Sequence, residues 1–68
     1  MEWYGVQRDG KWLARKTHSS LKDSFGLYWS ADIQSARRYD SEGAAVRQAM
    51  RINGSMKVRK VVGLKVVA

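Results

Sequence analysis

The chain has 68 residues, with thirteen lysines and arginines against six aspartates and glutamates, so its formal net charge is +7. It contains no cysteine and one histidine, which excludes a disulfide framework, a thiolate zinc site and a multi-histidine metal cluster. Its length predicts a single domain over residues 1–68, and no apolar run approaches the ~20 residues that cross a bilayer.

The first predicted element is a β-hairpin over residues 3–16, with Asp9-Gly10 at its turn. If these two residues alone form the loop, Gln7 pairs with Trp12, and large apolar side chains lie on both faces of the hairpin. If the loop has three residues, Val6 pairs with Trp12 instead.

The three-residue loop separates apolar from basic side chains. Its apolar face holds Tyr4, Val6, Trp12 and Ala14. Its other face holds Trp3, Gln7, Lys11, Leu13 and Arg15. A slip of one residue turns a strand's side chains to the opposite face, so a sheet with one buried face favours a segregating register. We therefore predict the three-residue loop.

A loop and a short strand are predicted next. Residues 17–26 are rich in Ser, Lys, Asp and Thr and show no period, which predicts a loop. The single histidine lies in it without a partner at metal or triad spacing, so we assign it no catalytic or ligand role. Residues 27–29 predict a third strand beside the hairpin. Phe25, Leu27 and Trp29 alternate, and we expect them to fill the core.

A first helical segment is expected after this strand. Ser30 can cap it, and Ile33 and Ala36 lie three residues apart on one side. Arg37 and Arg38 are then expected to face outward near its C-terminal end, where positive charge is favoured.

A second helix can begin at Asp40 or Ser41 and end at Asn53-Gly54. Its apolar stripe points away from that of the first segment at 100° per residue, so one straight helix could not bury both. Gly43 inside a helix would cost about 1 kcal/mol relative to alanine. These observations predict a break within residues 40–43.

The last segment, residues 56–68, has the alternation of a long strand, with Gly63 as a bulge or bend. Its basic side carries Lys57, Arg59 and Lys65, while Lys60 falls on the apolar side. The predicted fold class is therefore α+β. We expect a small antiparallel sheet of three to four strands, in the order β-β-β-α-β, with one helix or a broken helix packed on one face.

Several short motifs resemble a known family. They are Gly5-Val6, Gly10-Lys11-Trp12, Ala14-Arg15, Ala36, Tyr39-Asp40 and Ala44-Ala45. They resemble the three-stranded-sheet-plus-helix DNA-binding domains of plant ethylene-response factors and, more loosely, the arm-binding domains of phage integrases. The resemblance implies that one sheet face packs on the helix while the other enters the major groove. It places Val6, Trp12 and Ala14 inward and Arg8 and Arg15 on or beside the reading face, whereas Gln7 stands where the family has arginine.

The charge and the motifs together indicate the class of function. No nucleophile–base pair, paired carboxylate site or phosphate-binding glycine loop is visible, so we expect a non-enzymatic protein without cofactor, metal or catalytic residue. The net charge of +7 and a pI near 10.3 predict nucleic-acid binding, with DNA favoured over RNA. The candidate contacts are Trp3, Gln7, Arg8, Lys11, Arg15, Lys57, Arg59 and Lys65.

A different class of function remains open. A small inhibitor or adaptor of phage or prophage type would bind a partner protein through the same face or through the edge of the C-terminal strand. In either case no membrane contact is expected, and the N-terminus lacks the pattern of a signal peptide. We therefore expect the protein in the cytoplasm.

Overall fold

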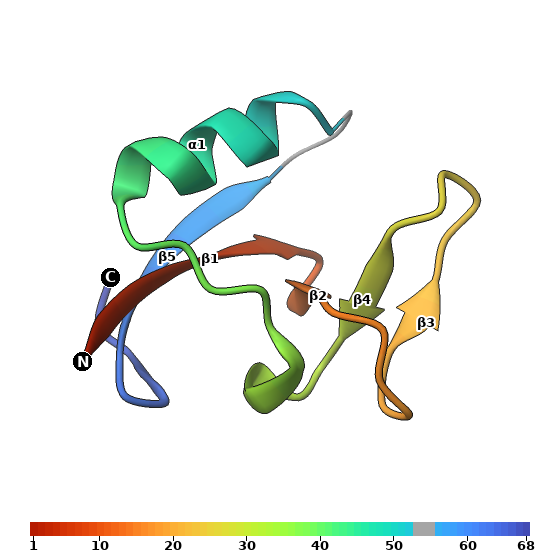
Figure 1. The fold of residues 1–68 in the computed structure, drawn as a ribbon, viewed down its shortest axis with the longest axis horizontal. Coiled ribbons are helices and arrows are strands. Elements are labelled where there is room, and N and C mark those ends of the chain that lie inside the picture. Colours follow the sequence, from red (N-terminus) through yellow and green to blue (C-terminus); the bar gives the residue numbers. More distant parts are fainter. Residues whose placement is uncertain (53–55) are drawn as a thin grey trace.

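The computed structural model describes residues 1–52 and 56–68 and has one antiparallel sheet with a single α-helix against it (Figure 1). The six strands are β1 (Glu2–Arg8), β2 (Lys11–Ala14), β3 (Leu21–Lys22), β4 (Tyr28–Ser30), β5 (Lys57–Val62) and β6 (Lys65–Val66). A 3₁₀ turn (Ile33–Ser35) and α1 (Glu42–Met50) connect β4 to β5. The strand order is β3-β4-β2-β1-β5-β6. The α+β class is confirmed, but the sheet has more strands than the three to four expected.

The hairpin between β1 and β2 closes with a two-residue loop. Asp9 and Gly10 have φ of 53° and 78°, as a type I′ turn requires at both central positions. Gln7 pairs with Trp12, so the predicted three-residue loop is wrong. The segregation argument failed because both faces of this sheet are covered, and apolar side chains are therefore needed on both.

Two apolar clusters lie on opposite faces of the sheet. The cluster on the α1 side contains Val6, Leu13, Trp29 and Ala45, with several half-buried side chains around it. The cluster on the other side contains Trp3, Trp12, Ala36 and Val61, and Ile33 packs against it. Val6, Trp12 and Ala14 are all buried, as the family resemblance implies, but Val6 faces α1 while Trp12 faces away.

The segment before α1 is extended rather than helical. Only the 3₁₀ turn forms, and its cap is Asp32, whose carboxylate accepts the Gln34 N–H at 3.0 Å. The predicted first helix, capped by Ser30, is therefore wrong. Beyond the turn, residues 35–39 insert between β1 and β2, which separate beyond their shared turn. Tyr39 exchanges two backbone hydrogen bonds there with Tyr4 on β1, and the Arg37 N–H donates to the Leu13 carbonyl on β2. These bonds satisfy peptide groups that the separating strands leave unpaired.

The helix α1 begins where the sequence predicts it. Ser41 is its N-cap and accepts the Ala44 N–H at 3.2 Å, which confirms one of the two predicted starts. The helix includes Gly43 in its first turn, so the break predicted within residues 40–43 lies before Glu42. The helix packs on β1 and β5 with Ala45 fully buried. The predicted stop at Asn53-Gly54 falls outside the described residues.

The C-terminal segment is a hairpin rather than one strand. Gly63 has φ of 63° at the first central position of a two-residue loop, as in a type II′ turn, so the predicted bend is confirmed. The predicted third strand is confirmed as β4, and the predicted loop before it contains the short strand β3. Phe25 is 77% exposed and does not fill the core as expected, whereas Trp29 is buried.

Candidate nucleic-acid interface

Three of the candidate contacts lie together on the sheet face opposite α1. Lys57 on β5 is directly across from Gln7 on β1, and Arg59 lies on the same face two residues along β5. The Arg59 Nε donates a hydrogen bond of 3.0 Å to the Gln7 Oε1. These three side chains, with Asp9 and Gly10, line a hollow. We call Gln7, Lys57 and Arg59 the β1–β5 patch.

Two other candidates, Trp3 and Arg8, make contacts within the protein that leave them unable to serve as ligand contacts. Trp3 is 2% exposed and its indole N–H donates to the Gly63 carbonyl at 2.7 Å, so its ring cannot stack on a base. Arg8 lies 4.2 Å above the Trp29 ring and 3.4 Å from the Asp23 carboxylate. Its charge is therefore already neutralised within the protein.

The remaining strand lysines lie away from the β1–β5 patch. Lys11 pairs with Arg8, so the two-residue loop turns it to the face opposite Gln7. Lys65 is exposed on the outer strand β6. The eight candidates therefore do not form one continuous reading face.

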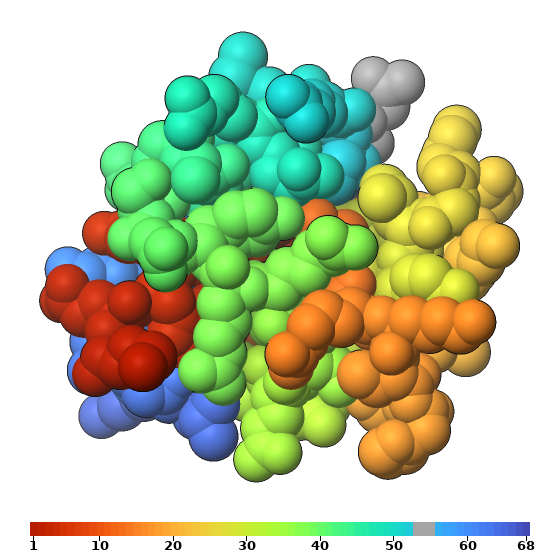
Figure 2. All heavy atoms as spheres, viewed as in Figure 1, coloured from red at the N-terminus to blue at the C-terminus, as the bar shows by residue number. Residues whose placement is uncertain are grey.

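The eighth candidate, Arg15, belongs to a different basic group. Arg15, Arg37 and Arg38 line a hollow of about 340 Å³ together with Tyr39, and we call these three the arginine cluster. The segment that carries Arg37 and Arg38 crosses the face shown in Figure 2 in green, beside the orange end of β2. Sequence reasoning missed these two residues because it placed them on the outside of a helix.

Neutral groups hold each arginine of the cluster. An Arg15 Nη atom donates to the Gln34 carbonyl at 2.8 Å, and the Arg37 Nε donates to the Ala14 carbonyl at 3.3 Å. The Arg38 guanidinium lies 4.9 Å from the centre of the Trp3 ring. Each guanidinium is oriented by its partner and keeps further N–H donors free for a ligand.

The charge of the cluster is not cancelled by carboxylates. In the part of the chain that the structure describes, the ion pairs are Arg8 with Asp23 and Lys60 with Glu2. Burial raises the pKa of Tyr39, against the smaller lowering effect of the Arg37 charge. The Tyr39 hydroxyl therefore stays protonated at neutral pH and can donate a hydrogen bond at the edge of the hollow.

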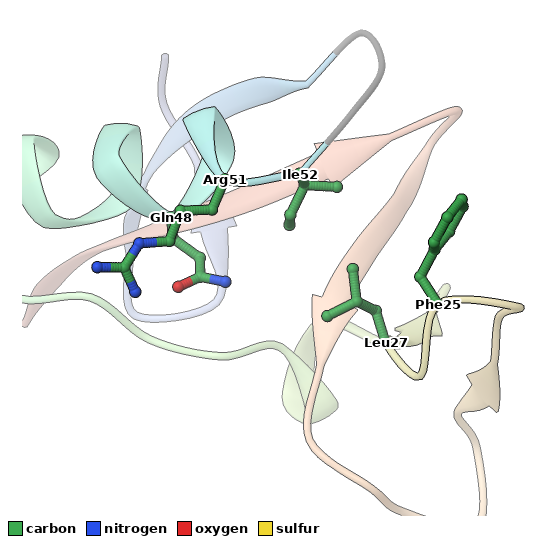
Figure 3. A pocket seen from close by; sticks show the side chains of 5 residues that line it. All are labelled: Phe25, Leu27, Gln48, Arg51 and Ile52. Carbon is green, nitrogen blue, oxygen red and sulfur yellow. The ribbon is translucent and has the colours of Figure 1, made fainter.

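A further hollow, with both apolar and polar side chains in its lining, lies at the C-terminal end of α1. Its lining combines Phe25 and Leu27 with Gln48, Arg51 and Ile52, and its volume is about 310 Å³. Figure 3 shows Leu27 and Ile52 pointing toward one another, with Phe25 on one side and Gln48 and Arg51 on the other. We call it the Phe25 hollow.

The described residues contain no candidate metal centre and no helix that could span a membrane. No group of three or more His, Cys, Asp or Glu side chains that could hold a metal ion occurs within residues 1–52 and 56–68. No helix in these ranges is long and apolar enough to span a bilayer.

Comparisons with protein-family models, curated proteins and solved structures find no match to the chain.

Proposed function

We propose that this chain is a non-enzymatic module that binds nucleic acid through its phosphates. The observation that carries the proposal is the arginine cluster, in which three guanidinium groups line one hollow and neutral groups hold them in place. Guanidinium forks match the geometry of phosphate oxygens better than lysine ammonium groups do. The net charge of +7 would also attract a polyanion at long range.

The β1–β5 patch would provide a second contact. Lys57 and Arg59 can meet phosphates, and the Gln7 amide can reach a base edge while its oxygen remains bonded to Arg59. This patch lies on the sheet face away from α1, which is also the face of the Trp3 ring that the Arg38 guanidinium covers.

A binding titration with a matched control tests the proposal. The double variant Arg15→Gln/Arg37→Gln removes two charges from the cluster, and Lys22→Gln/Lys65→Gln removes two exposed charges from the outer strands β3 and β6. We expect fluorescence anisotropy with labelled DNA and RNA to show weaker binding for the cluster variant and nearly unchanged binding for the control. Equal weakening would mean that net charge alone attracts the ligand.

A protein partner is the second candidate. It is favoured by exposed apolar side chains on both faces of the C-terminal hairpin, where Val62, Leu64, Val66 and Val67 are 41%, 48%, 42% and 51% exposed. Since β6 is an outer strand of the sheet, an extended segment of another protein could pair beside it. Absence of binding to any DNA or RNA at low salt would favour this candidate over the first.

A further inference from the structure

The turn that carries Phe25 is held by hydrogen bonds to the Asp23 carboxylate. One oxygen of the Asp23 carboxylate accepts the backbone N–H groups of Phe25 and Leu27, each at 2.9 Å. The other accepts the Trp29 indole N–H at 2.8 Å and lies 3.4 Å from an Arg8 Nη atom. Asp23 therefore ties the turn to the core.

The result is an exposed aromatic ring on a fixed backbone. Phe25 is 77% exposed, and core packing does not explain why a phenylalanine stands at this position. A large apolar side chain presented by a rigid segment costs little conformational entropy when it binds a ligand. The Phe25 ring is therefore accessible to a ligand and is not part of the core.

The other side chains around the Phe25 hollow add polar groups. The Gln48 amide offers both donors and an acceptor, and the Arg51 guanidinium offers donors and a positive charge. Leu27 and Ile52 form the apolar part of the lining, and the lining residues within 1–52 and 56–68 include no carboxylate. Its volume of about 310 Å³ is at the lower end of the range for small-molecule pockets, about 300–1,000 Å³.

We propose that the Phe25 hollow receives one unstacked nucleobase, so that the nucleic acid bound by this chain is single-stranded. This inference rests on the proposed function and names the ligand class. Phe25 would stack on the base, Gln48 would bond its edge, and Arg51 would contact the adjoining phosphate. A base inside a duplex is stacked between its neighbours and cannot enter such a hollow without being flipped out.

The position of the Phe25 hollow relative to α1 would allow one nucleic-acid strand to reach both this hollow and the arginine cluster. The arginine cluster lies just before the N-terminus of α1, and the Phe25 hollow lies at its C-terminal end. The nine residues of α1 span about 13 Å, and Arg47 on this helix is exposed. A single strand running along α1 could therefore place phosphates in the cluster and one base in the hollow.

The test compares Phe25→Ala with Phe25→Trp on a short oligothymidylate and on the corresponding duplex. We expect Phe25→Ala to weaken single-strand binding about five- to 150-fold and to leave duplex binding unchanged, since stacking is lost. Phe25→Trp should keep the single-strand affinity because its ring can still stack. Both variants should fold, because this side chain is exposed.

Three outcomes would overturn the inference, and they separate it from the proposed function. If Phe25→Ala binds the single strand as the wild type does while Arg15→Gln/Arg37→Gln binds it weakly, the phosphate site stands and the base pocket is wrong. If the wild type prefers the duplex, the single-strand assignment is wrong. If the wild type binds no nucleic acid at low salt, both proposals fail, and an acidic peptide with an aromatic side chain becomes the next ligand for the hollow.

Discussion

The Trp12 indole packs over Gly5, so that a Cβ on Gly5 would come within 2.5 Å of the Trp12 Cζ3. Trp3 approaches from the same side, and the centres of the two indole rings are 5.9 Å apart. Gly5 thus makes room for two tryptophans on the sheet face opposite α1. This close contact depends on the register of the first hairpin.

Replacing Gly5 with alanine should therefore destabilise the protein. Overpacking of this kind costs about 1–3 kcal/mol of the free energy of unfolding, and a urea titration followed by tryptophan fluorescence would measure the loss. Gly43→Ala is the matched control, because its Cβ would meet nothing within 4 Å and it lies in α1. It should stabilise by about 0.5–1 kcal/mol. A neutral Gly5→Ala change would contradict the packing described here.

Truncation of Trp12 or of its neighbour Leu13 should remove most of the stability of the domain. Trp12 and Leu13 are 4% and 1% exposed and belong to clusters on opposite faces. We expect Trp12→Ala to cost about 3–5 kcal/mol and Leu13→Ala about 2–5 kcal/mol, against a total stability of about 5 kcal/mol or a little more for so small a domain. Circular dichroism melts would measure both. Tolerance of one of the two changes would mean that only one face of the sheet is buried.

Local signals predicted the elements that depend on a few neighbouring residues. The Asp9-Gly10 turn, the Ser41 cap and the bend at Gly63 could all be predicted, because each depends on the conformational preference of one or two residues. The hairpin register could not, because it depends on whether the second sheet face is covered. The helix expected after Ser30 also failed, since hydrogen bonds to two separate strands outweigh its weak local preference.

The candidate site was predicted only in part, because some of its residues are positioned by contacts between segments that are distant in the sequence. Lys57 and Arg59 follow from alternation along one strand, which is a local property. Arg15 was expected on the same face as Gln7, but the two-residue loop turns it to the other face, where it joins the arginine cluster. Arg37 and Arg38 required knowledge of the extended segment between β1 and β2. Trp3 was misplaced because sequence alone does not distinguish an aromatic residue of the core from one that stacks on a ligand.

Protonation of the Asp23 carboxylate should lower the free energy of unfolding at acid pH. Its hydrogen bond from Trp29, with further ones from Leu27, Phe25 and Arg8, lowers its pKa below the ordinary 3.8 in spite of some desolvation. A lowered pKa in the folded state stabilises the protein above the unfolded-state pKa and loses this effect as pH falls through the folded-state value. The melting temperature of the wild type should therefore fall below about pH 4.

Asp23→Asn isolates this contribution from the other carboxyl groups. The variant should melt at a lower temperature than the wild type at neutral pH, and the difference should shrink in acid, because protonated Asp23 also loses its charge. A difference between the two proteins that stays constant from neutral pH to acid would contradict the assigned role of the carboxylate.

The salt dependence of single-strand binding tests the central claim most directly. The affinity of the wild type, of Arg15→Gln/Arg37→Gln and of Lys22→Gln/Lys65→Gln would be measured for one oligothymidylate over a series of salt concentrations. Each phosphate contact to a single strand contributes about 0.7 to the slope of log affinity against log salt, so the cluster variant should have a slope flatter by about 1.4. The control should keep the wild-type slope. Parallel slopes for the wild type and the cluster variant would contradict phosphate binding by the arginine cluster.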